Sequence, residues 1–124
     1  MHCIARGLSG SAVTFWTAWD GDALLGCGAL KSLGADHGEI KSMRTARAHL
    51  RKGVPQAVLT VLLNEAERRG YARINLETGS SPAFLPAHAL YARNGFARCG
   101  PFGDYLPNAF SVFMSKALPV RPAW

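Results

Sequence analysis

The sequence of 124 residues lacks what a membrane protein, a secreted protein or a disulfide scaffold would need. No apolar run approaches the ~20 residues of a membrane-spanning helix, and the first ten residues do not have the form of a signal peptide. The cysteines are odd in number (Cys3, Cys27 and Cys99) and form no CxxC motif. This usage indicates neither a disulfide framework nor a zinc site, and we expect a cytoplasmic protein with reduced thiols.

Several enzyme signatures are also missing. The sequence contains no GxxxxGK[ST] phosphate loop, no GxGxxG turn after a strand, no HExxH helix and no GxSxG elbow. The four histidines are scattered without metal-ligand spacing. We therefore set aside the enzyme classes that these motifs mark, and we expect no bound metal.

Acidic residues are scarce relative to basic ones. Eight Asp and Glu against fourteen Lys and Arg give a formal net charge of +6, which favours a polyanionic partner such as nucleic acid, a membrane surface or a phosphorylated cofactor. The basic residues are not interleaved with aromatic residues as a nucleic-acid stacking surface requires, so we expect neither nucleic acid nor membrane as a partner. With 48% hydrophobic and 18% charged residues, the chain is predicted to form one globular domain over residues 1–124.

Hydrophobic periodicity predicts an alternation of strands and helices. Alternating or β-branched segments predict strands at 13–19, 23–30, 39–45, 73–78, 96–99 and 110–116. Helical spacing predicts one helix between Gly53 and Gly70 and a second from about Pro86 to Asn94. Residues 1–11 show no clear period and are expected to be a lead-in, and 33–38 and 100–108 are expected to be loops. The order β-β-β-α-β-α-β-β indicates a mixed sheet with helices packed on its faces.

The segment from Glu39 to Gly70 organises the rest of the sequence. It reads as a strand, a basic turn at 47–52 that ends in Gly53, and a helix whose apolar residues recur at helical spacing (Leu59, Leu62, Leu63 and Ala66). Such a turn directs free backbone N–H groups at whatever lies above the helix N-terminus, and a phosphate fits there. Strand–turn–helix units also occur for structural reasons alone, so the pattern indicates an anion site without establishing one.

Two motifs, taken in order, resemble the acetyl-CoA-dependent N-acetyltransferases of the GNAT superfamily. That superfamily marks its cofactor turn as [Q/R]-x-x-G-x-[G/A], where this chain has LRKGVP at 50–55. It often ends a later helix with LY-x-x-x-GF, where this chain has LYARNGF at 90–96. The segments LETGSSPAFLPAHALYARNGF, CGPFGDY and SVFMSKAL are similar to a subgroup of small bacterial acetyltransferases. The resemblance covers about residues 13–118.

The resemblance implies a GNAT-like α/β fold, a mixed and splayed β-sheet with helices on both faces. It also implies acetyl-CoA as co-substrate. The residues expected to cradle its phosphates are Arg51, Lys52, Gly53, Val54, Pro55 and Gln56, and those expected to pair with its pantetheine arm are Met43, Arg44 and Thr45. Two positions depart from the family pattern. Leu50 replaces the usual Arg or Gln, and Pro55 replaces Gly or Ala and has no N–H to offer. The resemblance also implies that the chain lacks the N-terminal strand and helices with which the family usually opens.

The resemblance further implies an acyltransferase in which a primary amine of a small molecule or peptide attacks the acetyl group directly. Glu39 matches the catalytic glutamate of the histone acetyltransferases as a general base, and Glu77 is the second candidate. Tyr91 matches the tyrosine that protonates the departing thiolate. The alternative readings are a strand-edge carboxylate for Glu39 and a core residue for Tyr91.

Three further expectations concern the whole molecule. A catalytically weak or inactive CoA-binding or regulatory module of the same fold is the alternative function, favoured by Leu50, Pro55 and the short start. Three aromatic residues, Phe102, Tyr105 and Phe110, are candidates to line the acceptor pocket. A homodimer is expected because the aromatic residues of the first predicted strand (Phe15, Trp16 and Trp19) would form an apolar edge or face that needs a cover.

Overall fold

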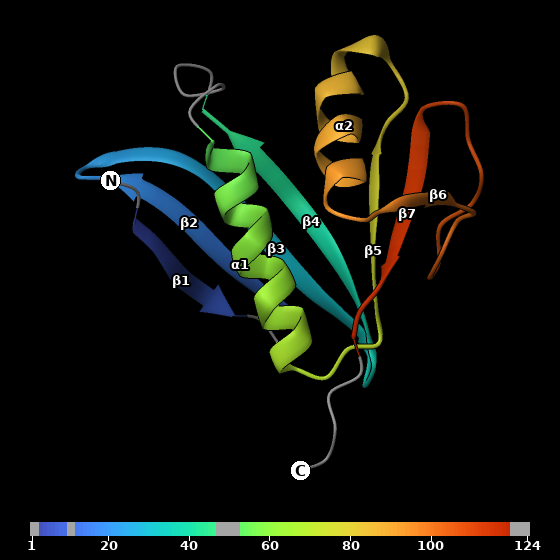
Figure 1. Cartoon of the computed structure of the whole chain (residues 1–124), viewed down its shortest axis with the longest axis horizontal. Coiled ribbons are helices and arrows are strands. Elements are labelled where there is room, and N and C mark those ends of the chain that lie inside the picture. The colour runs from blue at the N-terminus through green and yellow to red at the C-terminus, as the bar shows by residue number, and fades with distance from the viewer. Residues whose placement is uncertain (1–2, 10–11, 47–52, 120–124) are drawn as a thin grey trace.

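The computed structural model describes residues 3–9, 12–46 and 53–119. The strands are β1 (Cys3–Ser9), β2 (Val13–Asp20), β3 (Ala23–Gly34), β4 (His37–Thr45), β5 (Arg73–Gly79), β6 (Ala97–Cys99) and β7 (Ser111–Ala117). The helices are α1 (Val54–Arg68), the short 3-10 helix η2 (Pro82–Phe84) and α2 (Leu85–Arg93). All seven strands belong to one mixed sheet with the order β1-β2-β3-β4-β5-β7-β6, so the predicted α/β fold class is confirmed (Figure 1). No helix in these ranges is long and apolar enough to cross a membrane.

The sheet splits in its middle, between β4 and β5. These two strands are its parallel pair, and they are bonded only from His37↔Arg73 to Ile40↔Leu76. Beyond that point β4 continues to Thr45 and β5 to Gly79 with no pairing between them. Beyond Ile40, the β4 residues Lys41, Arg44 and Thr45 are still paired with β3 on their other side, so one backbone edge of β4 faces the opening. The sheet is therefore splayed, as the family resemblance implies.

The two α-helices of the described residues, α1 and α2, pack on the same face of the sheet. Val58 and Leu62 of α1 and Leu90 and Tyr91 of α2 belong to one continuous core, together with Leu76 of β5. Figure 1 shows α1 and α2 on the same side of the strands. Because β4, β5 and β6 run in the same direction and are linked in that order across the sheet, right-handed crossovers place both connecting helices on one face. The expectation of helices on both faces is wrong for the described part of the chain.

Two segments expected to be irregular are strands or tight turns. The lead-in contains β1, which pairs antiparallel with β2 from Cys3↔Trp19 to Ser9↔Thr14. The pairing needs only backbone groups, so a segment without hydrophobic alternation can still join a sheet. The expected loop at 33–38 is a short turn at 35–36, because β3 continues to Gly34 and β4 begins at His37.

Glycines on β3 bring α1 close to the sheet. A Cβ on Gly28 would lie 2.8 Å from Met43 Sδ and 2.8 Å from Val58 Cγ1, and a Cβ on Gly26 would lie 3.0 Å from Val54 Cγ1. A larger residue at Gly28 would press on Met43 and on Val58 of α1, and one at Gly26 would first meet the Arg44 carbonyl of β4, at 2.6 Å. The two glycines therefore set the depth at which the N-terminal half of α1 rests.

An ionic cluster fixes the other end of α1. The Glu65 carboxylate accepts hydrogen bonds from Arg68 (2.8 and 2.5 Å) and from Arg69 Nε (2.8 Å). Arg69 also donates to Thr14 Oγ1 on β2 (3.1 Å) and lies 5.9 Å from the centre of the Trp16 ring. The hydrogen bonds from Arg68 and Arg69 hold the pKa of Glu65 at about 2, below the ordinary value of 4.5. The cluster thus joins the C-terminal end of α1 to β2.

We expect Glu65→Gln to lower the free energy of unfolding at neutral pH by up to about 1 kcal/mol, since the ion pairs are partly exposed. A carboxyl whose pKa is depressed by folding stabilises the protein above its unfolded pKa, and this contribution is lost as the pH falls through the folded pKa. The difference between the two proteins should therefore be constant above pH 4.5 and vanish toward pH 2. Urea unfolding at several pH values measures it, with the exposed Asp22→Asn as control; a difference unchanged down to pH 2 contradicts the assignment.

Candidate active site

A cavity occupies the opening between β4 and β5. It has a volume of about 330 Å³. It is lined by Ile40, Lys41, Ser42, Met43 and Arg44 of β4, by Glu77, Thr78 and Gly79 of β5, and by Phe84, Ala87, Tyr91, Phe110 and Ser111. The cavity thus lies along the unpaired edge of β4, and we call it the slot. Four site residues predicted from the sequence, Met43, Arg44, Glu77 and Tyr91, line this slot.

A β-bulge shapes the β4 side of the slot. The register with β3 shifts between Cys27↔Arg44 and Ala29↔Lys41, and Ser42 there has a φ of 57°. The Cys27 thiol donates to the Ser42 carbonyl at 3.4 Å. A bulge bends its strand and redirects the following side chains. Met43 accordingly faces α1 and lines both the slot and the neighbouring groove.

A larger groove, of about 610 Å³, runs from the slot to the N-terminus of α1. Its walls are Met43 and Thr45 of β4, Gly53, Pro55 and Gln56 at the start of α1, and Ala83, Pro86, Ala87, Leu90, Tyr91 and Arg93 of the η2–α2 segment. Gly53 is the N-cap of α1, with a φ of 74° and no side-chain capping bond. The first-turn N–H groups of a helix have no intrahelical acceptor, so Val54 and Gln56 present theirs here, whereas Pro55 has none. The groove therefore suits an anion.

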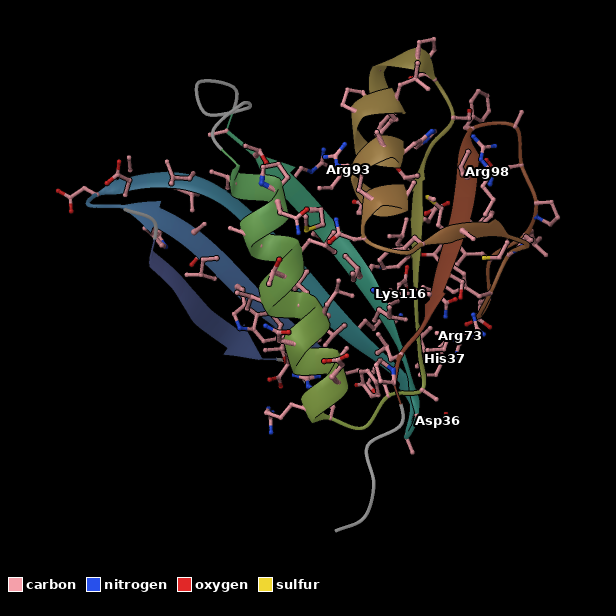
Figure 2. All side chains as sticks on the ribbon, viewed as in Figure 1. Asp36, His37, Arg73, Arg93, Arg98 and Lys116 are labelled. Atoms are coloured by element: carbon pink, nitrogen blue, oxygen red, sulfur yellow. The ribbon has the colours of Figure 1, made fainter. Side chains whose placement is uncertain are left out.

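Two features of this groove were not predicted from the sequence. Gln56 and Asn94 exchange side-chain hydrogen bonds of 2.9 and 2.8 Å, which join the first turn of α1 to the end of α2. Arg93 lies beside this contact, and Figure 2 shows it extending from α2 toward the N-terminal end of α1. The sequence offered one signal for Arg93: it lies in the LYARNGF motif, one helical turn after Leu90. Arg51 and Lys52, the cations that the sequence did single out, lie outside the described residues.

Glu39 lies on the face of the sheet opposite the helices. It is buried, at 3% exposure, and it accepts a hydrogen bond of 2.7 Å from the Tyr105 hydroxyl to Oε2. Burial, followed by this hydrogen bond, raises the pKa of Tyr105 well above its usual range. A cavity of about 300 Å³ adjoins the pair and is lined by Lys31, Leu33, Glu39, Phe102, Gly103, Asp104 and Tyr105. We call it the open-face pocket.

Glu77 lies on the same face as Glu39. Asn75 is the direct neighbour of Glu39 across the parallel pair, and Glu77 follows two residues later on β5. Glu77 is exposed, and its carboxylate accepts a 2.5 Å hydrogen bond from Ser111 Oγ. The register therefore directs the two carboxylates to the same side of the sheet.

Tyr91 lies on the helix side of the slot. It is 6% exposed and packs edge-on against Phe96, with ring centroids 5.8 Å apart. Burial raises the pKa of the Tyr91 hydroxyl, so the phenol keeps its proton at neutral pH. A proton donor thus borders the slot from one face of the sheet, and two carboxylates lie on the other face.

The aromatic candidates for an acceptor pocket fall into two places. Phe102 and Tyr105 lie together, 5.2 Å apart, and pack against Phe113 of β7. Phe110 is separate; it lines the slot and is 82% exposed. The segment between β6 and β7 thus supplies one aromatic cluster on the open face and one ring at the slot.

Comparison with known proteins agrees with this architecture. A sequence profile of the acetyltransferase (GNAT) family matches residues 4–96. The chain is 58% identical over 111 residues to the uncharacterised N-acetyltransferase YsnE of Bacillus subtilis (strain 168), covering 90% of this chain and 74% of that protein. It is 47% identical to the uncharacterised N-acetyltransferase YedL of Escherichia coli (strain K12), covering 90% and 70%.

A solved structure shares the fold. The acetyltransferase of Bacillus subtilis in complex with CoA superposes with a TM-score of 0.79 at 18% identity, covering 96% of this chain and 100% of that one. The family match covers most of the sequence and includes both the cofactor turn and the LY-x-x-x-GF helix end. The chain therefore belongs to the acetyltransferase (GNAT) family and is an acyltransferase.

Proposed function

We propose that this protein transfers the acetyl group of acetyl-CoA to a primary amine of a small molecule or peptide by direct attack. One observation carries the proposal. The opening between β4 and β5 is lined by a buried phenol, Tyr91, on the helix side and by the carboxylate Glu77 of β5, and Glu39 lies on the open face beside the last paired residues, Ile40↔Leu76. A thioester laid in the slot would meet a proton donor at its sulfur and a proton acceptor near the incoming amine.

The groove and the slot fit the parts of coenzyme A. The pyrophosphate would bind at the N-terminus of α1, where Gly53, Val54 and Gln56 offer backbone groups and Arg93 adds a positive charge. Pro55 offers no N–H, so this site has one donor fewer than the family pattern. Arg51 and Lys52 are further proposed phosphate partners.

The pantetheine arm would lie along β4 at Met43, Arg44 and Thr45. This stretch is bonded to β3 on one side and has no strand partner on the side of the slot within the described residues. An extended, amide-containing arm can bond to such an edge as an added strand does. The fold neighbour from Bacillus subtilis is a complex with CoA, which supports the same co-substrate here.

The proposed reaction has three steps. Glu39, or Glu77 in its place, takes a proton from the acceptor ammonium. The free amine then attacks the thioester carbonyl, the C–S bond breaks, and Tyr91 gives its proton to the departing thiolate. The products are an N-acetylated acceptor and free CoA.

We expect Gly53→Val to weaken acetyl-CoA binding by at least tenfold. A Cβ at Gly53 meets no atom within 4 Å, but a β-branched residue is strained at a φ of 74°. The turn would relax and its N–H groups would no longer converge. Calorimetric titration with acetyl-CoA measures the change.

The matched control is Gly70→Val. Gly70 also has a positive φ, 80°, and open space around its Cβ position, but it lies just beyond the C-terminal end of α1. It should cost similar stability and leave binding unchanged. Equal affinity of Gly53→Val and the parent would locate the phosphate site elsewhere.

We expect Glu39→Gln and Tyr91→Phe to differ in their pH–rate profiles. Glu39→Gln should lose about 10²–10⁴-fold in rate at low pH and recover part of it at high pH, where the amine is already deprotonated. Tyr91→Phe should lose rate without that recovery, since a free amine does not help the thiolate to leave.

Both variants should bind acetyl-CoA as the parent does, because the α1 turn is untouched. Thiol release from acetyl-CoA with one amine acceptor, followed across pH, distinguishes them. If Glu39→Gln keeps the full rate at every pH, Glu39 is a structural carboxylate and Glu77 becomes the base to test.

A cytoplasmic homodimer is also part of the proposal. Phe15 is 42% exposed on β2, where it pairs with Ala29 on the open face, away from the helices. Trp16, expected to share this surface, is instead 6% exposed and belongs to the core on the helix side, so Phe15 is the exposed aromatic residue that a partner would cover. We expect a dimeric mass by light scattering at micromolar concentration and a lower mass for Phe15→Lys; a monomeric parent contradicts the dimer.

A further inference from the structure

The proton acceptor proposed above is almost enclosed. The Glu39 side chain is 3% exposed, and its Oε2 already accepts the Tyr105 hydroxyl at 2.7 Å. Tyr105 is only partly buried and lines the open-face pocket together with Glu39. An acceptor in that pocket therefore reaches the phenol more readily than the carboxylate.

We propose that Tyr105 is a catalytic residue that relays the acceptor's proton to Glu39. This inference rests on the proposed N-acetyltransferase function and on Glu39 as its base. In this proposal the ammonium group of the acceptor binds in the open-face pocket.

The phenol is held in place for this role. Its ring lies 5.2 Å from that of Phe102 and 5.5 Å from that of Phe113 on β7. The Tyr105 N–H donates to the Phe102 carbonyl at 3.1 Å, which closes a turn in the β6–β7 segment. A proton relay needs such fixed geometry, because hydrogen bonds must align on both sides of the oxygen.

The relay balances without a further reactant. The Tyr105 oxygen donates its proton to Glu39 Oε2 and accepts, on a lone pair, an N–H of the ammonium. As the ammonium proton moves to the Tyr105 oxygen, the original phenol proton moves to Glu39. The phenol is regenerated, Glu39 is protonated, and the amine holds a free electron pair for attack on the thioester.

The surroundings favour a phenol over a phenolate. Burial and the neighbouring carboxylates raise the pKa of Tyr105, so the relay starts with its proton in place at neutral pH. The charged and titratable groups on this face around Glu39 are Lys31 on β3, His37 and Lys41 on β4, Arg73 and Glu77 on β5, and Asp104 beside Tyr105. Lys31 is the direct cross-strand neighbour of Glu39 and lines the same pocket, so it can balance the carboxylate's charge.

The test compares Tyr105→Phe, Glu39→Gln and the double variant. The assay is thiol release from acetyl-CoA with the fastest acceptor found among the free amino acids and simple diamines. Tyr105→Phe should lose about 10²-fold in rate at neutral pH, recover at high pH as Glu39→Gln does, and keep the parent's affinity for acetyl-CoA. Because both residues act on one proton, the double variant should be no slower than the slower single variant.

Tyr71→Phe is the matched control. Tyr71 is buried against Gly38 of β4 on the helix face. Tyr71→Phe therefore also removes a phenol oxygen, but on the side of β4 opposite Tyr105. Its rate and pH profile should match the parent.

Three results would overturn the relay. Full activity of Tyr105→Phe beside an impaired Glu39→Gln means that Glu39 receives the proton by another path. A double variant slowed by the product of the two single effects means that Tyr105 acts by packing. Full activity of Glu39→Gln removes the relay and Glu39 as the base, and it leaves Glu77 as the base to test, so a failure of the relay is distinguishable from a failure of the proposed function.

Discussion

The early end of the pairing between β4 and β5 is the constraint on which the site depends. Four residue pairs hold the strands together, from His37↔Arg73 to Ile40↔Leu76, and the strands then diverge. A continuous sheet would separate its two faces completely. Here the strands part, and the slot between them is lined by Tyr91 of α2 and Glu77 of β5, which is where the proposed transfer would take place.

Contacts elsewhere in the protein compensate for the backbone hydrogen bonds that β4 and β5 do not form where they diverge. The glycines of β3 let α1 rest close against the sheet beside β4, and the Glu65–Arg69–Thr14 contacts fix its far end to β2. On the other side of the opening, α2 packs on β5 and β7 through the common core. The Gln56–Asn94 pair then bridges the two helices. The slot thus lies between two parts of the protein, α1 with β2–β4 and α2 with β5 and β7, and side-chain contacts set the distance between them.

Local sequence patterns predicted the parts of the site that depend on neighbouring residues. The helix that begins at Gly53, the strand that carries Glu39 and the helix that carries Tyr91 were all predicted, because periodicity and capping are properties of short segments. The resemblance to the GNAT superfamily supplied the splay of the sheet. Strand β1 was missed, because its sequence has no hydrophobic alternation and only its backbone pairing with β2 makes it a strand.

Contacts between distant segments could not be predicted in the same way. Tyr105 and Glu39 are 66 residues apart, and only the sheet order places the β6–β7 segment over β4. Tyr105 was singled out as an aromatic residue of the acceptor pocket, but its bond to the carboxylate has no sequence signal. The placement of both helices on one face also depends on strand order, which periodicity does not determine.

The two phenols of the site bear on where the acceptor's proton can finally rest. Burial is the main cause of the raised pKa of both Tyr91 and Tyr105. At neutral pH each hydroxyl can therefore donate a hydrogen bond, and neither is a net proton sink. A proton removed from an ammonium must end on a stronger acceptor, and the carboxylate bonded to Tyr105 is Glu39. Among the described residues no carboxylate is hydrogen-bonded to the Tyr91 hydroxyl, so under the proposed mechanism its proton would go to the departing thiolate. The same side chain, in two environments, thus suits the two ends of one transfer.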